Sequence, residues 1–323
     1  MNTLFIRLAR AGALLALTVI MLGAWVRLTD AGLGCPDWPG CYGRLVVPQG
    51  LSPAELGDEY TRPLEAGKAW REMIHRYLAS ALGLLCVALA VIAWRNRSDP
   101  VQPWRAPMAL VALVIFQGLL GMWTVTLLLK PIVVVAHLLG GFATLALLVS
   151  LGQWRSSRFA SPTRGLRVLG AAAAAALVLQ ISLGGWTSAN YAAVACPDFP
   201  TCQTQWWPAI ADFDEAFVLW RGLGIDYEGG VLDHPARVAV HFTHRLGALL
   251  ATVLIALLGW RLARQAATRP DGMAVLAALV LQLGLGVSIV WFGVPLAVAV
   301  LHNGVAALLL LAVINANQRI RQR

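Results

Sequence analysis

The residues in this chain best suited to chemistry are histidines, which occur in two sets that repeat between its halves. Each half has a histidine followed by an arginine and, later, a second histidine: Glu72-Met73-Ile74-His75-Arg76 with His137-Leu138, and His241-Phe242-Thr243-His244-Arg245 with His302-Asn303. Imidazoles on separate helices can take both axial positions of a haem iron, and an ionisable side chain inside a membrane marks a functional site. The pattern therefore predicts two paired sites, His75 with His137 and His244 with His302.

The composition indicates that these histidines lie in an integral membrane protein. Of the 323 residues, 59% are hydrophobic and 13% are charged, and the mean hydropathy is +0.69. A soluble domain with this composition would lack the polar surface that faces water. We expect an all-α fold, because lipid offers the backbone of a spanning segment no hydrogen-bond partner outside its own helix.

Eight apolar stretches each approach the roughly 20 residues that cross the hydrocarbon core of a bilayer. They cover residues 5–26, 73–94, 107–129, 132–154, 168–189, 238–260, 273–292 and 295–315. Short runs recur in both halves: Leu22-Gly23-Ala24-Trp25 resembles Leu183-Gly184-Gly185-Trp186, and Gln117-Gly118-Leu119-Leu120-Gly121 resembles Gln282-Leu283-Gly284-Leu285-Gly286. We therefore predict two repeated four-helix bundles, an N-terminal unit over residues 1–158 and a C-terminal unit over residues 159–323.

The distribution of charge predicts the orientation of the bundle. Arginines gather at the start of the first apolar stretch (Arg7 and Arg10) and after the second, fourth, sixth and eighth, whereas nearly all of the 16 acidic residues lie in two long loops, about 27–72 and 190–237. Arginine-rich connections face the cytoplasm. We therefore expect a multi-pass membrane protein with both termini cytoplasmic. Its net charge of +9 follows from this bias and requires no nucleic-acid partner.

Four of the five cysteines form two Cys-x5-Cys pairs in the predicted outer loops. Disulfides persist in an oxidising compartment, so we expect the bonds Cys35–Cys41 and Cys196–Cys202. Two interpretations remain open: structural staples for the loops, or redox exchange with a thiol protein or with the reaction itself. A zinc site is disfavoured, because no second pair of ligands lies nearby in the sequence. Cys86 lies in an apolar stretch and is expected to be inert packing.

Charged residues beside the histidines have more than one possible role. Arg76 and Arg245 directly follow predicted ligands and either anchor the helix at the membrane interface or bind haem propionates. Glu72 lies one helical turn before His75, where burial would make it a usable proton acceptor. The second half has His241 in that place, and His241 remains an alternative ligand. This asymmetry predicts that one site does chemistry while the other holds a permanent cofactor.

Taken together, these features resemble the haem A synthase family, the membrane enzymes that convert haem O to haem A. The resemblance covers the whole chain. It rests on the eight apolar stretches in two repeats, the Glu-x-x-His-Arg motif at 72–76, the His-Arg pair at 244–245, and the run Arg27-Leu28-Thr29-Asp30-Ala31-Gly32-Leu33-Gly34-Cys35-Pro36-Asp37-Trp38-Pro39. The cysteine pairs match bacterial members that carry them in both outer loops.

The resemblance implies that the N-terminal half holds the haem O substrate and that the C-terminal half holds a haem b cofactor. His75 and His137 would be the substrate-site pair, and His244 and His302 would ligate the haem b iron. Arg76 would then contact the substrate haem, and its counterpart in the C-terminal half, Arg245, would be the candidate for the propionates of haem b.

The resemblance also implies the oxidation of one ring methyl group to a formyl group in two water-dependent steps, with Glu72 as the base. The expected partners are membrane lipid, a membrane electron acceptor and a haem O synthase.

Two other functions would explain part of the pattern. A dihaem b-type electron-transfer cytochrome would explain the histidines, but neither Glu72 nor the asymmetry between the halves. A quinone-linked disulfide oxidant would explain the cysteines but not the histidines. Such oxidants usually need a closely spaced reactive pair such as Cys-x-x-Cys, and neither loop has one.

Overall fold

The computed structural model describes all residues except 1–2, 49–59, 61, 153–162 and 322–323. Within the described residues, eight helices are long and apolar enough to cross a membrane. The predicted all-α membrane fold with eight spanning helices is thus confirmed. The expected boundary between residues 158 and 159 lies outside the described residues.

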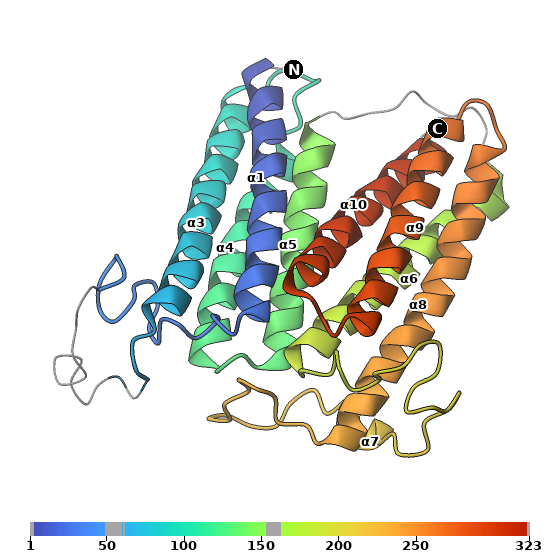
Figure 1. The fold of residues 1–323 in the computed structure, drawn as a ribbon. Coiled ribbons are helices and arrows are strands. Elements are labelled where there is room, and N and C mark those ends of the chain that lie inside the picture. Colours follow the sequence, from blue (N-terminus) through green and yellow to red (C-terminus); the bar gives the residue numbers. More distant parts are fainter. Residues whose placement is uncertain (1–2, 49–59, 61, 153–162, 322–323) are drawn as a thin grey trace. The chain divides into compact units, whose positions relative to one another are not determined.

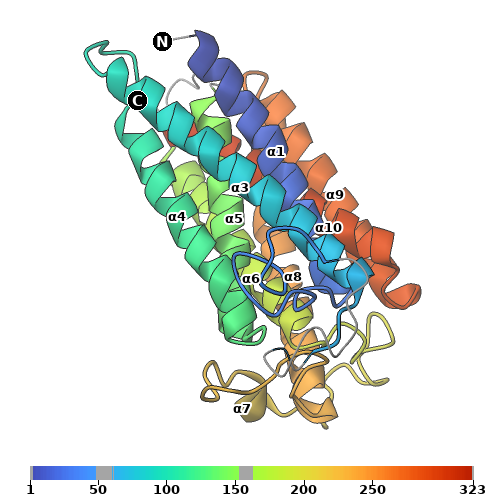
Figure 2. The same ribbon diagram turned by 90° about the vertical axis from the view of Figure 1, so that its left-hand side faces the viewer.

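The first compact unit consists of residues 1–153 together with residues 219–231. Its spanning helices are α1 (Thr3–Leu28), α3 (Ala66–Arg95), α4 (Arg105–Thr126) and α5 (Pro131–Leu151). Each helix packs against two others in the closed order α1, α3, α4, α5 (Figure 1 and Figure 2). Consequently α3 and α5, which carry the first pair of histidines, stand diagonally across the bundle.

The second unit consists of residues 154–218 and 232–323. Its spanning helices are α6 (Arg164–Ala189), α8 (His234–Ala263), α9 (Arg269–Trp291) and α10 (Leu296–Arg321), and the short α7 (Phe213–Ala216) packs against α8. The closed order of contacts is α6, α8, α9, α10. The second pair of histidines therefore also lies on two diagonal helices, α8 and α10.

Residues 219–231 belong to the first unit although the sequence places them in the C-terminal half. The ring of Tyr227 is buried against three apolar side chains of that unit, Leu33, Val125 and Leu129. Lys130 is 2% exposed, and its ammonium group lies 3.5 Å from the centroid of the Trp220 ring. Arg62 forms ion pairs with two carboxylates of the segment, Asp226 and Glu228. This segment is therefore an integral part of the first unit.

Four helices, α3, α6, α8 and α9, begin at least four residues earlier than the apolar stretches predict. The helix α3 begins at Ala66 instead of residue 73, and α8 begins at His234 instead of residue 238. Polar turns extend both helices beyond their apolar part, and at α8 the side chain of Asp233 accepts a hydrogen bond from the first-turn amide of Ala236 at 3.0 Å. As a result, His75 and His244 lie beyond the second turn of their helices.

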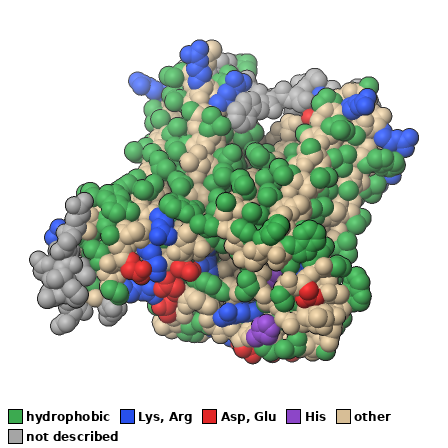
Figure 3. Space-filling view, in the orientation of Figure 1, with side chains coloured by type: hydrophobic (Ala, Val, Ile, Leu, Met, Phe, Trp, Pro, Cys, Tyr) green, Lys and Arg blue, Asp and Glu red, His purple; other side chains and the backbone are tan. Residues whose placement is uncertain are grey.

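Surface chemistry agrees with a membrane location. On the face drawn in Figure 3, hydrophobic side chains cover the middle of the helices in each unit. Most of the acidic side chains seen there lie near the loops at one end of the helices. An apolar belt with charge confined to the ends is expected for helices that span a bilayer.

Candidate haem-binding sites

The first unit brings His75 of α3 and His137 of α5 together from diagonal helices. His75 packs beside Gly23 of α1, and His137 packs beside Gly121 of α4. In both residues Nδ1 is buried and has no hydrogen-bond partner among the described residues. Buried polar atoms are nearly always paired in folded proteins, so this arrangement indicates a site that binds another group.

The second unit likewise carries His244 on α8 and His302 on α10, its diagonal helices. Here each imidazole has a glutamine beside it. The amide nitrogen of Gln180 lies 3.0 Å from His244 Nδ1 and donates to the backbone carbonyl of His244 at 3.1 Å. The amide nitrogen of Gln282 lies 3.1 Å from His302 Nε2. The second pair is therefore surrounded by more polar groups than the first.

The glutamines follow a spacing that the sequence analysis does not recognise. A Gln-x-x-x-Gly motif occurs once on each of three helices that carry no predicted ligand, as Gln117-to-Gly121 on α4, Gln180-to-Gly184 on α6 and Gln282-to-Gly286 on α9. The fourth such helix, α1, has Val19 and Gly23 in these places. Because residues at i and i+4 share a helix face, a search for this spacing across all the helices would have found the motif.

Both pairs fit a haem. A haem iron needs only two axial ligands from the protein, one on each side of the ring. Two imidazoles on diagonal helices would supply these ligands, and the buried Nδ1 atoms of His75, His137 and His302, which have no hydrogen-bond partner among the described residues, fit a site that binds another group. Each unit therefore has one candidate haem site.

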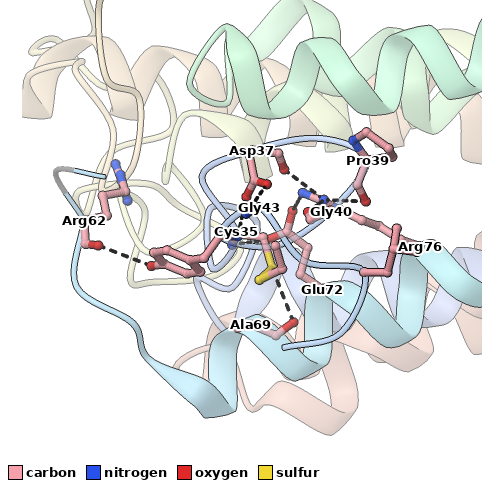
Figure 4. Close-up of a disulfide and its surroundings, with 12 residues drawn as sticks. Cys35, Asp37, Pro39, Gly40, Gly43, Arg62, Ala69, Glu72 and Arg76 are labelled. Carbon is pink, nitrogen blue, oxygen red and sulfur yellow. Dashed lines mark hydrogen bonds and ion pairs between the residues drawn. A yellow bond between two sulfur atoms is a disulfide. The ribbon is translucent and has the colours of Figure 1, made fainter. Parts of the chain in front are cut away.

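Glu72 is held between α3 and the first disulfide loop (Figure 4). Its side chain is buried, one carboxylate oxygen accepts a hydrogen bond from the amide of Cys35 at 2.9 Å, and the other pairs with Arg76 at 2.5 Å. The carboxylate is thus fixed one helical turn from His75. Both contacts come from N–H donors, so they hold the carboxylate in one position.

In the second unit His241 takes the place of Glu72. Its Nδ1 accepts a hydrogen bond from the amide of Cys196 at 3.3 Å, which is the same contact with the first cysteine of a disulfide loop. His241 is thus engaged with the loop, whereas His244 faces Gln180 of α6. This geometry favours His244 over His241 as the ligand.

The arginines that follow the histidines hold the disulfide loops. Arg76 Nη1 donates to three loop carbonyls, those of Asp37 at 2.9 Å, Pro39 at 3.3 Å and Gly40 at 2.6 Å (Figure 4). Arg245 likewise donates to three, those of Asp198 at 2.7 Å, Thr201 at 2.6 Å and Cys196 at 2.8 Å. The sequence predicts that these arginines anchor the helix at the membrane interface or bind haem propionates. Neither prediction includes their hydrogen bonds to the loop carbonyls. The Nε of Arg245 remains without a partner among the described residues.

The four loop cysteines pair as expected, Cys35 with Cys41 and Cys196 with Cys202. In the second loop, burial would raise the pKa of Asp198, but hydrogen bonds from Thr201 and from the amides of the loop hold it below the usual value. Asp37 accepts the matching amide bonds in the first loop. Cys86 is free and buried in α3, as expected for packing.

Comparison with known proteins places this chain in a family. The model of the COX15-CtaA family, described as cytochrome oxidase assembly protein, matches residues 7–314. The chain belongs to this family. The matched range includes all four histidines of the two pairs as well as Glu72.

Curated relatives in this family carry the name heme A synthase. The protein of Shewanella oneidensis is 43% identical over 96% of this chain and 94% of its own length. Those of Halalkalibacterium halodurans and Rhizorhabdus wittichii are 28% and 29% identical, over 90% and 94% of this chain and 88% and 90% of their own lengths. The chain therefore spans nearly the whole length of each of these relatives.

Proposed function

We propose that this chain is a haem A synthase, an oxidoreductase that converts haem O to haem A in the membrane. The observation that supports this function most directly is the difference between its two histidine pairs. Both units provide two imidazoles on diagonal helices, but only the first has a buried carboxylate one turn from a ligand. Membership of the family and the names of the relatives supply the reaction.

In this function the first unit binds haem O through His75 and His137, and the second binds haem b through His244 and His302. Haem b, when bound, supplies a redox centre that can pass electrons to a membrane acceptor. One ligand of each pair, His75 or His244, is followed directly by an arginine that holds a disulfide loop.

Glu72 is the residue of the first unit that can take up a proton. Conversion of a methyl group to a formyl group requires two oxidations, each releasing two electrons and two protons, with water as the source of oxygen. A carboxylate positioned beside the substrate can accept protons from that water. The contacts with Cys35 and Arg76 keep Glu72 in one place. Haem O carries a long isoprenoid tail, which suits entry from the bilayer between helices.

Chromatography of extracted haems tests this function. Membranes that contain the protein and are supplied with haem O should accumulate haem A, and oxygen-labelled water should place its label in the formyl group. A His75→Ala variant should accumulate none. If the wild-type protein binds haem but forms no haem A, the chain is instead a dihaem b-type electron carrier.

We also propose that the protein lies in the bacterial inner membrane with both termini cytoplasmic, and that a haem O synthase delivers its substrate. Ser98 lies exposed in the connection between α3 and α4, which the arginine distribution assigns to the cytoplasm. A Ser98→Cys variant should react with an impermeant maleimide only when the cytoplasmic face is accessible. Labelling of intact cells from outside would refute the orientation.

A further inference from the structure

In the first unit, both predicted ligands pack against a glycine on a neighbouring helix that carries no ligand. A Cβ atom added to Gly23 of α1 would lie 3.0 Å from Cε1 of His75. One added to Gly121 of α4 would lie 3.6 Å from Cε1 of His137. The first distance is shorter than ordinary van der Waals contact between carbon atoms, and the second is within it.

The second unit repeats this arrangement. A Cβ atom on Gly184 of α6 would lie 3.2 Å from Cε1 of His244, and one on Gly286 of α9 would lie 3.2 Å from Cε1 of His302. All four contacts reach the same ring atom. In each unit, one diagonal pair of helices thus supplies the imidazoles and the other pair supplies the glycines.

The helices themselves do not require these glycines. None of the four has a positive φ angle, and alanine favours a helix interior more than glycine does. What glycine provides here is space beside an imidazole. Nδ1 of His75 and of His302 has no hydrogen-bond partner among the described residues. Packing against the glycine therefore helps to set the position of each ring, together with the Gln282 amide beside Nε2 of His302.

We propose that Gly23, Gly184 and Gly286 are positioning residues that set the orientation of the imidazoles on the haem irons. A methyl group at any of these positions would force the ring to rotate or shift, because the contact would be too short to keep. Gly121 has room for a methyl group and is not included. The role in haem binding depends on the function proposed above, whereas the packing relation between glycine and ring does not.

A double-mutant cycle on the haem-free protein tests the packing. Gly286→Ala should lower the midpoint of thermal unfolding in the wild-type background but not in a His302→Ala background, where the ring that it displaces is gone. Gly184→Ala should likewise lower the midpoint in the wild-type background but not in a His244→Ala background. A glycine that matters only for helix packing would cost the same in both backgrounds, and that result would overturn the inference. If Gly286→Ala fails to fold alone, restored folding in the double variant still supports it.

Haem spectra test the positioning. Gly184→Ala and Gly286→Ala should lower haem affinity about tenfold, as loss of support around a metal ligand commonly does, and should shift the electron paramagnetic resonance g values that report imidazole orientation. Gly118→Ala and Gly284→Ala are matched controls on α4 and α9, because an added Cβ meets nothing within 4 Å.

Gly121→Ala should resemble the wild type. Equal loss of haem in Gly284→Ala and Gly286→Ala, or unchanged spectra in all variants, would refute the positioning role. A wild-type protein without haem would refute the proposed function instead, and the cycle on the haem-free protein would still decide the packing.

Discussion

The two units use the same arrangement of helices, histidines, glycines and disulfide loops, but they differ in the residues next to the ligands. Glu72 in the first unit and His241 in the second both bind the amide of the first loop cysteine, at 2.9 Å and 3.3 Å. Gln180 contacts His244, whereas the matching position in the first unit is Val19. The second site thus has groups that orient a ligand, and the first has a group that can move a proton.

The second unit also has a buried ion pair at the end away from its disulfide loop. There Asp271 of α9 and Arg319 of α10 form a buried ion pair, and Asn315 donates to Asp271 at 3.0 Å. Such a pair adds little net stability but specifies how two helices meet, because separating the charges is costly. A unit fixed in this way suits a cofactor that stays bound, and the first unit suits a substrate that must enter and leave.

The largest expected effect concerns the ligands. Removing one of two axial ligands should release a haem held permanently, so His244→Ala or His302→Ala should lose most of the bound haem b. His75→Ala or His137→Ala should retain much of it and form no haem A. Absorption spectra of the purified variants measure this. His234→Ala, at an exposed loop-side position, is the control, and equal haem loss in all four ligand variants would show that the units are not specialised.

Glu72→Gln tests the group found only in the first unit. Glutamine keeps the size of the side chain but cannot act as a base, so the formation of haem A should fall about 100-fold or more while the haem b spectrum stays near that of the wild type. Chromatography of extracted haems and spectra of the same samples give both results. Glu72→His, which installs the residue of the second unit, should keep the loop contact and remain inactive. Activity in either variant at the wild-type level would exclude Glu72 as the base.

Exchanging Val19 and Gln180 tests whether the polar residues make the second site permanent. Gln180→Val removes the amide that contacts His244 and should weaken haem b binding about tenfold. Val19→Gln places an amide beside His75 and should slow the release of the haem bound there. Haem titration of the two variants measures both effects. Unchanged affinity in Gln180→Val would mean that the amide does not orient its ligand.

Much of this arrangement can be predicted from the sequence, because the apolar stretches and the histidine motifs occur in both halves of the chain. Hydropathy predicts the eight spans, and the matched motifs predict which histidines pair. Hydropathy does not detect polar helical turns that lie outside the hydrocarbon core. This is why α3 and α8 begin before the predicted apolar stretches. The roles of Arg76 and Arg245 in holding the loops depend on how a loop folds back onto a helix, and side-chain type alone does not give that geometry. The attachment of residues 219–231 to the first unit likewise depends on contacts distant in sequence.

The smallest effect is expected from removing the disulfides. The variants that lack them distinguish a structural role of each bond from a redox role. Each bond closes a short loop that arginine and aspartate also hold, so its loss should cost at most about 3 kcal/mol and act mainly on that loop. If the bonds are staples, replacing both Cys35 and Cys41 with serine should loosen the hold on Glu72 and lower turnover several-fold without abolishing it. The matching change at Cys196 and Cys202 should affect haem b retention instead, since that loop contacts His241 and Arg245. Thermal unfolding, haem content and turnover of the two double variants give these values. Complete loss of turnover in a variant with normal stability and normal haem content would instead assign the bond a redox role, because a staple can act only through structure.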